Sequence, residues 1–301
     1  MAKVGVVDQR EGIQEMNTPE VDLVVNCYDR TYEKVLSPGF MNGLEKAAKF
    51  TFTRKTVLIN NVTDRVRVAF LARELKNSGE ISNWFFVADE LPRALDIVGL
   101  TEKDLGRTIH YSEWALVAVT LNGSPYLCCW DADVILGQHS GWISEALGLL
   151  EMRSDVLVAS PQSEHDLEVR SHINSPWTRR RWRPLEEVQN FKLGYGFSDQ
   201  LFLAKRANLT KPIYKEFCIP SVAYPMSQIS PIFEQRVDSY MRNHKLLRAV
   251  ITSSSYTHTG NMGASYPRMT IIERARDLLI RRFGVKLLAF IFCTQKKFNG
   301  I

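Results

Sequence analysis

Short apolar segments that alternate with helical ones constrain the fold of this chain more than any other feature. Four segments have the length and the valine-rich or aromatic character of buried strands: residues 21–28 (VDLVVNCY), 55–61 (KTVLINN), 84–88 (WFFVA) and 125–130 (PYLCCW). Because helical segments separate these strands, the chain is predicted to form an α/β fold. Its sheet should be mostly parallel, doubly wound and flanked by helices.

The connecting segments support this order of elements. Residues 39–50 and 112–121 have helical spacing, and Asp64 can cap a helix that runs to about Asn77, with Gly79 ending it. The second half is less regular. Helices are expected there at residues 141–151, 230–243 and 268–282, and strands at residues 155–160, 200–204 and 246–252.

The composition disfavours a secreted or membrane-spanning protein. The 301 residues are 45% apolar and 24% charged, so the chain can bury a core without disulfides or structural metal. The five cysteines include no CxxC pair and are interpreted as reduced, buried thiols of a reducing compartment. The N-terminus, MAKVGVVDQREG, is too polar for a signal peptide, and no apolar run approaches the ~20 residues of a transmembrane helix. We therefore expect a cytoplasmic protein.

Polar side chains follow the end of each predicted strand. In doubly wound sheets, ligands bind where the carboxyl ends of the strands meet. The residues at these ends are Asp29 and Arg30, Asn60 and Asn61, Asp89 and Glu90, and Asp131 with Asp133. Acids and amides at four neighbouring strand ends suit a polar ligand that carries a metal ion.

The run YLCCWDADVIL places two carboxylates, Asp131 and Asp133, directly after an apolar strand. Hard cations such as Mg²⁺ or Mn²⁺ take oxygen ligands and often keep substrate phosphates in their shell. One aspartate would ligate the ion, and the other could hold a ribose or a metal-bound water. A D-x-D tripeptide also arises by chance on protein surfaces, but the buried strand and the three β/α units before it favour a metal site.

The order of these parts resembles the GT-A glycosyltransferase superfamily. VDLVVNCYDR resembles its opening strand and WDADVIL its DxD element, and the resemblance covers about residues 20–260 at the level of architecture. It implies transfer of a sugar from a nucleoside-diphosphate donor to a glycan or lipid-linked acceptor, with Mn²⁺ or Mg²⁺ as cofactor. The donor contacts that it implies are Asn26, Tyr28, Asp29, Arg30, Asn61, Asp64, Asp89 and Asp131.

The resemblance also implies a third metal ligand late in the chain, beside Asp131 and Asp133. The segment YTHTGNMG supplies His258, next to Gly260 and Gly263, and glycines let a backbone come close to a phosphate. The alternative is a loop histidine that bonds to the backbone.

An inverting transferase needs a carboxylate to take the proton of the acceptor hydroxyl. Asp199 follows a glycine-rich turn in GYGFSDQLFLA, although a cap or turn role is equally natural there. Glu234 and Asp238 stand at i and i+4 on one helix face, which is the pattern of a solvated face as well. A retaining enzyme would need no such base, so the residues leave inversion and retention open.

Residues 161–196 lose periodicity, and we interpret them as a long functional loop or lid. Within them, SPWTRRRWRP combines four arginines with two tryptophans. These side chains suit a donor diphosphate or a lipid-diphosphate acceptor, or they form a plain basic loop. Nucleic acid fits least, because no recognised nucleic-acid module surrounds the run.

The C-terminal segment is basic and amphipathic. Apolar residues at helical spacing over 268–282 alternate with arginines, and an aromatic, lysine-ended stretch follows. Such a segment can lie on an anionic membrane surface, here the inner face, or it can pack on the core. We therefore expect a catalytic domain over residues 1–265 and an amphipathic helical tail over 266–301. The nucleotide-sugar half would span about 20–135 and the acceptor half 136–265.

Two other functions remain compatible with these residues. A phosphatase of the haloacid dehalogenase type also places D-x-D after an apolar strand, and Asp131 would then be the nucleophile. That motif usually opens the catalytic core, whereas about 100 residues of predicted α/β structure precede it here. A transferase-like module that binds a nucleotide sugar or glycan without turnover is the non-enzyme alternative. A sugar nucleotidylyltransferase is disfavoured, because no glycine-rich signature follows the first strand.

Overall fold

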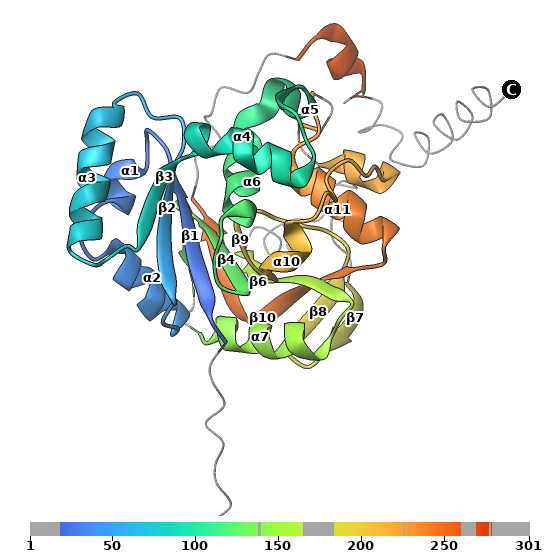
Figure 1. Ribbon diagram of the computed structural model, residues 1–301. Helices are drawn as coiled ribbons and strands as arrows, with labels where there is room; N and C mark the ends of the chain where they lie inside the picture. The colour runs from blue at the N-terminus through green and yellow to red at the C-terminus, as the bar shows by residue number, and fades with distance from the viewer. Residues whose placement is uncertain are drawn as a thin grey trace, which may run out of the picture.

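The described part of the chain forms one ten-stranded sheet (Figure 1). The computed structural model describes residues 19–137, 140–164, 184–224, 226–227, 229–259, 269–276 and 278. The strands are β1 Val21–Cys27, β2 Arg54–Ile59, β3 Asn83–Phe86, β4 Tyr126–Asp131, β5 Val134–Leu136, β6 Val156–Ser163, β7 Pro184–Val188, β8 Phe191–Gly194, β9 Leu201–Lys205 and β10 Leu247–His258. Their order across the sheet is β3-β2-β1-β4-β9-β6-β10-β8-β7, with β5 pairing with β10.

The direction of the strands confirms the predicted fold class. Strands β3, β2, β1 and β4 are parallel neighbours, and β10 is parallel to β6. Strand β9 runs antiparallel between β4 and β6, and the β7–β8 hairpin closes one edge of the sheet. The first four predicted strands are therefore all present, in one parallel block.

Helices cover both faces of this sheet (Figure 1). They are α1 Tyr32–Val35, α2 Phe40–Ala48, α3 Arg65–Asn77, α4 Val87–Val98, α5 Glu102–Leu105, α6 Glu113–Thr120, α7 Trp142–Met152, α10 Arg206–Leu209 and α11 Phe233–Asn243, with the 3-10 helices η1 Gly106–Tyr111 and η2 Ile219–Ala223. Successive residues of β1 belong to opposite cores. Leu23 packs in the core that contains residues of α2, α3 and α7, whereas Val24 packs in the core with α4, α6 and α11.

Local signals explain where several helices begin and end. The Asp64 carboxylate accepts a hydrogen bond from the Arg67 backbone amide at 2.9 Å, which caps α3 as predicted. Helix α6 is buried on all sides, because its residues are almost all apolar and it lies between the sheet and α4. Among the described residues, no helix has the length and apolar character needed to cross a membrane.

Two expectations from the sequence are corrected. The segment 161–196 is not a single long loop, because β6 extends to Ser163 and residues 184–194 form the β7–β8 hairpin against β10. Residues 165–183, which contain the arginine–tryptophan run, lie outside the described residues. The third strand ends at Phe86, and α4 begins at Val87 without a connecting loop. Of the predicted C-terminal helix, residues 271–276 and 278 are described as helical.

Candidate active site

The D-x-D turn stands at the carboxyl edge of the sheet, between β4 and β5. Strand β5 turns back and pairs with the end of β10, so that Val134 lies opposite His258. Lys34 Nζ donates to the Ala132 carbonyl at 2.9 Å, and the Asp131 amide donates to the Gln200 carbonyl at 2.8 Å. Contacts from α1, β10 and the segment before β9 therefore fix this turn.

Two buried side-chain oxygens without partners lie side by side at this edge. Asp131 is the register partner of Asn26 in the parallel β1–β4 pair, so both side chains point to the same face of the sheet. Within the described residues, Asp131 Oδ1 and Asn26 Oδ1 are buried and have no hydrogen-bond partner. Buried polar atoms in native proteins are almost always paired, and an unpaired one calls for an explanation such as a bound ion. A cation or a donor group of a ligand would satisfy both oxygens.

The environment of Asp131 opposes its charge. Burial first, and then the neighbouring Asp133 carboxylate, raise the pKa of Asp131 to about 7. Only 20% of its side chain is exposed. The carboxyl group therefore holds a proton for part of the time at neutral pH, and a bound cation would displace that proton.

Asp133 is connected to the first strand through Tyr28. The Tyr28 hydroxyl donates to Asp133 Oδ2 at 2.9 Å, across 105 residues of sequence. Burial and this hydrogen bond raise the pKa of Tyr28 to about 12, so the hydroxyl stays neutral and remains a donor. The Asp133 carbonyl accepts from the Thr259 amide at 2.8 Å, which ties the turn to the residue after His258.

His258, the last residue of β10, lies close to Asp131 at the predicted metal site. Its Nε2 lies 4.0 Å from Asp131 Oδ2, and burial lowers its pKa, which favours the neutral ring that binds metals. Among the residues that the structure describes, no group of three or more His, Cys, Asp or Glu side chains forms a metal-holding cluster. Asp131 and His258 are placed to supply part of a coordination shell, and Mg²⁺ or Mn²⁺ sites commonly complete it with waters and substrate phosphates. The residues present fit such an open site.

Asp199 and Glu234 form a hydrogen-bonded pair of carboxyl groups near Asp131. Burial raises the pKa of Asp199 well above its usual range, and the charges of Glu234 and Asp131 add to this effect. Asp199 precedes β9, and Glu234 lies in the first turn of α11. Two carboxyl groups in such contact titrate as a pair, and this arrangement can serve as a general acid or base.

Asp238 has a different environment, although it stands one helical turn after Glu234. Its side chain is completely buried, and its Oδ2 accepts from Ser221 Oγ at 2.6 Å and from Arg242 Nε at 2.7 Å. The interpretation of this position as a solvated helix face is therefore wrong. The contacts are those of a group that holds α11 against η2.

The remaining donor contacts that the resemblance implied lie along the ends of β1, β2 and β3. Asp29 accepts from the Thr63 hydroxyl and from the Thr63 amide, the latter at 2.8 Å, and these two bonds hold the pKa of its carboxyl below the usual value. Asn61 adopts a left-handed backbone (φ 46°), and its amide contacts Glu113 Oε1 at 3.1 Å. Asp89 pairs with Arg65 at 2.6 Å on an exposed surface. Asp64 uses its carboxylate as the cap of α3, and Arg30 is exposed.

Sequence reasoning missed several residues of this edge. Lys34 lies in a short helix whose proximity to the D-x-D turn depends on tertiary contacts. Gln200, Thr259 and Glu113 are likewise brought in by contacts with residues distant in the sequence. The sequence offers one signal for Gln200 and Thr259, because each lies directly before or after a strand, where ligand-binding residues of such sheets are found.

In architecture, the chain is similar to several solved glycosyltransferase structures. One similar structure is glucosyl-3-phosphoglycerate synthase from Mycobacterium tuberculosis in complex with Mn²⁺, uridine diphosphate and phosphoglyceric acid. It is 13% identical with a TM-score of 0.46, and the match covers 87% of this chain and 78% of that chain. GalNAc-T7 with UDP, GalNAc and Mn²⁺ is 10% identical with a TM-score of 0.45, covering 83% of this chain and 45% of that chain.

A third similar structure is mouse xyloside xylosyltransferase 1 in its apo form. It is 12% identical with a TM-score of 0.42, and the match covers 82% of this chain and all of that chain (100%). No family model matches the chain, and no curated protein matches it.

Proposed function

We propose that this protein transfers a sugar from a nucleoside-diphosphate sugar to an acceptor hydroxyl, assisted by a divalent metal ion. The observation that carries the proposal is the pair of unpartnered buried oxygens, on Asp131 and Asn26, at the carboxyl edge of a doubly wound sheet. Ligands of such sheets bind at this edge. A divalent metal ion that binds together with the donor diphosphate would supply the positive charge. This charge would satisfy the two oxygens and favour the ionised form of Asp131.

Each residue of the site has a part in this proposal. Asp131 and His258 would hold the ion, and Tyr28 positions Asp133 beside them by donating to its Oδ2. When bound, the ion neutralises the charge that develops on the departing diphosphate. Asn26 bonds to the donor beside Asp131, and Lys34 keeps the turn in place through the Ala132 carbonyl.

The pair of Asp199 and Glu234 is the proposed base of the reaction. Its ionised form can take the proton of the acceptor hydroxyl, which makes inversion the outcome that this pair supports. The charge of Asp131 contributes to the raised pKa of Asp199. This effect indicates that the pair lies near Asp131. Asp238 is not part of the proposed base, since Ser221 and Arg242 already engage it.

The variant Glu234→Gln tests this pair through the pH dependence of the rate. A base with a raised pKa gives a rate that rises with pH, because the base must lose its proton first. Removing the negative charge of Glu234 lowers the pKa of Asp199, so the acidic limb of kcat/KM should move to lower pH. The measurement is the pH profile at saturating Mn²⁺, with the exposed Glu74→Gln as the matched control. An acidic limb at the same pH in Glu234→Gln and the parent would remove the pair from the mechanism.

A screen for the donor tests the proposed function itself. UDP-, GDP- and dTDP-sugars are added with and without Mn²⁺, and thermal unfolding is followed. One donor class should raise the unfolding temperature only when metal is present, because ligands that bind the native state stabilise it. Release of phosphate from a simple phosphomonoester, without any such shift, would favour the phosphatase alternative. A metal-dependent shift without turnover would favour the binding module.

The start of the C-terminal tail supports an acceptor at a membrane surface. Ile271, Ile272 and Leu278 are 86%, 66% and 60% exposed, whereas Glu273 in the same segment pairs with Arg107 at 2.9 Å. Exposed apolar residues on a basic helix favour the surface of an anionic membrane. Deleting residues 283–301 should lower binding to anionic vesicles in a flotation assay and leave binding to neutral vesicles unchanged. Equal flotation of both proteins on anionic vesicles would contradict this role.

A further inference from the structure

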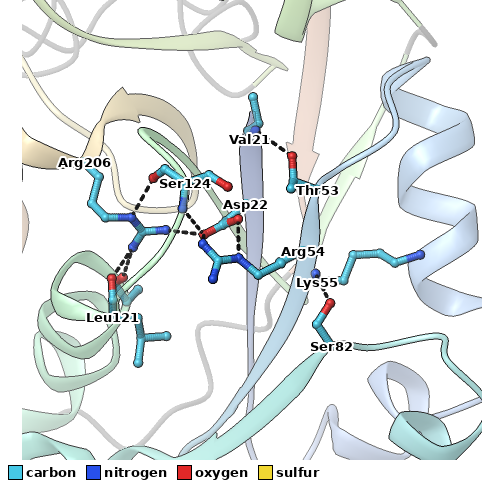
Figure 2. A network of polar contacts seen from close by, with 10 residues as sticks. Val21, Asp22, Thr53, Arg54, Lys55, Ser82, Leu121, Ser124 and Arg206 are labelled. Atoms are coloured by element: carbon cyan, nitrogen blue, oxygen red, sulfur yellow. Dashed lines mark hydrogen bonds and ion pairs between the residues drawn. The ribbon is translucent and has the colours of Figure 1, made fainter. Parts of the chain in front are cut away.

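A second concentration of charge lies at the opposite, amino-terminal edge of the sheet (Figure 2). Asp22 in β1 is 4% exposed, and its carboxylate accepts from Arg54 at 3.1 Å, from Arg206 at 2.7 Å and from the Ser124 amide at 2.8 Å. Arg206 also donates to the carbonyls of Leu121 at 2.7 Å and Ser124 at 3.0 Å. The buried Arg206 is thus fully explained by the fold, since it caps the end of α6 and pairs with Asp22.

The fold does not account for the charge of Arg54 in the same way. Asp22 is a single carboxylate that faces two guanidinium groups, and the side chain of Arg54 is 40% exposed. Arg54 borders a cavity of about 260 Å³ between the sheet and α4. A third guanidinium, that of Arg93 in α4, borders the same cavity, and its side chain is 41% exposed.

The wall of this cavity carries an excess of positive charge. The guanidinium groups of Arg54, Arg93 and Arg206 face the carboxylates of Asp22 and Glu90, which leaves a net charge of +1. In a partly buried cavity, such an excess is screened less than on an open surface. An anionic ligand would neutralise it.

The geometry of the hydrogen bonds leaves donors for this ligand. Arg54 bonds to Asp22 through Nε and Nη2, whereas Arg93 bonds to Glu90 through Nε and to the Thr120 carbonyl through Nη1. In the described part of the chain, Arg54 Nη1 and Arg93 Nη2 have no hydrogen-bond partner. The cavity is also lined by the neutral polar residues Thr56, Asn83 and Asn122 and by the apolar residues Val24, Phe85 and Leu121.

We propose that this cavity binds the phosphate group of a small phosphorylated molecule or free phosphate. Arginine forks match phosphate oxygens, and Arg54 and Arg93 border this cavity together with the side-chain amides of Asn83 and Asn122. The cavity is smaller than the roughly 300–1,000 Å³ of sites for drug-sized ligands, which suits a compact anion. Asp22 precedes Asn26 by four residues of one strand, or about 13 Å, so this site is separate from the candidate active site and does not depend on its function.

Calorimetric titration in metal-free buffer tests the proposal, with inorganic phosphate and glycerol 3-phosphate as the two probes. The parent should bind at least one probe at one site per chain, and the tighter probe tells free phosphate from a phosphate ester. Arg93→Gln should weaken binding by about tenfold or more, because a charge-assisted hydrogen bond to phosphate is lost. Its ion pair with Glu90 is partly exposed, so Arg93→Gln should lose little stability and remain folded, which a thermal unfolding curve checks.

Two control variants separate this site from the rest of the molecule. Arg73→Gln removes an exposed positive charge of α3 and should leave the affinity unchanged. Asp131→Asn alters the candidate active site and should also bind phosphate like the parent. Equal affinity of Arg93→Gln and the parent, or no saturable binding of either probe by the parent, would overturn the proposal.

Discussion

Asp131→Asn is expected to lower the rate of sugar transfer by about 10³-fold or more, because the metal ion loses its anionic ligand. A metal that stabilises a departing diphosphate contributes several kcal/mol, and each 1.4 kcal/mol is tenfold in rate. Asparagine keeps the size of the side chain, so the turn held by Lys34 and Gln200 should persist. The measurement is product formation from the donor identified by the screen, at saturating Mn²⁺.

The same variant should not destabilise the metal-free protein. Burial raises the pKa of Asp131 to about 7, above the usual value of 3.8, so the folded state binds the proton more tightly than the unfolded state. This group therefore favours folding most at low pH, and its contribution falls as the pH rises from about 4 through about 7. Asparagine carries no charge to bury, so urea unfolding of Asp131→Asn should show an unfolding free energy equal to or above that of the parent at pH 8.

Asp96→Asn, on the exposed side of α4, is the matched control for both measurements. It should change neither rate nor stability. Sugar transfer by Asp131→Asn at the rate of the parent would contradict the metal site. Loss of rate together with loss of folding would show instead that Asp131 has a structural role.

The largest loss of stability is expected from Asp22→Asn, at about 3–5 kcal/mol, because it removes the only carboxylate that pairs with Arg206 among the described residues. The Arg206 side chain is 10% exposed, so its charge cannot return to water without unfolding. Asparagine still accepts a hydrogen bond from Ser124, but it leaves the guanidinium charge unpaired. The measurement is the unfolding free energy from urea titration.

Gly123→Ala should disturb the same network, because the added methyl group would crowd the ion pair of Asp22 and Arg206. A Cβ atom on Gly123 would lie 2.0 Å from Asp22 Oδ2 and 2.7 Å from Arg206 Nη2, so the ion pair must shift. We expect a loss of stability in the same direction but smaller than that of Asp22→Asn. Arg54→Gln is the control within the network, since Arg54 is 40% exposed and its loss should matter less. A change below about 1 kcal/mol in Asp22→Asn would show that the buried pair does not stabilise the fold.

The sequence predicted the parts of the fold that depend on local patterns. Residues 21–28 and 125–130 are apolar enough to be read as buried strands, and both are β-strands in the parallel block. Asp64 was recognised as a helix cap because capping depends on residues three positions apart. The hairpin of residues 184–194 was missed, because β7 is mostly exposed and its sequence, PLEEV, lacks the apolar alternation of a strand.

The candidate site was predictable only in outline. Asp131 and Asp133 could be chosen because they follow a strand, and in doubly wound sheets the ends of strands hold the ligand. The contact between Tyr28 and Asp133 and the pairing of Asp199 with Glu234 depend on tertiary packing, which no local pattern reports. Asp22 was hidden for a related reason, because it lies inside an apolar strand and its two arginine partners are 32 and 184 residues away.

Binding of Mn²⁺ tests the central claim most directly. The electron paramagnetic resonance signal of free Mn²⁺ is followed while protein is added, with the nucleoside diphosphate whose sugar stabilises the protein in the screen. We predict that the parent removes one equivalent of Mn²⁺ per chain and that Asp131→Asn removes much less at the same concentrations. Equal removal of Mn²⁺ by the two proteins, or none by the parent, would contradict a metal-assisted glycosyltransferase site at Asp131.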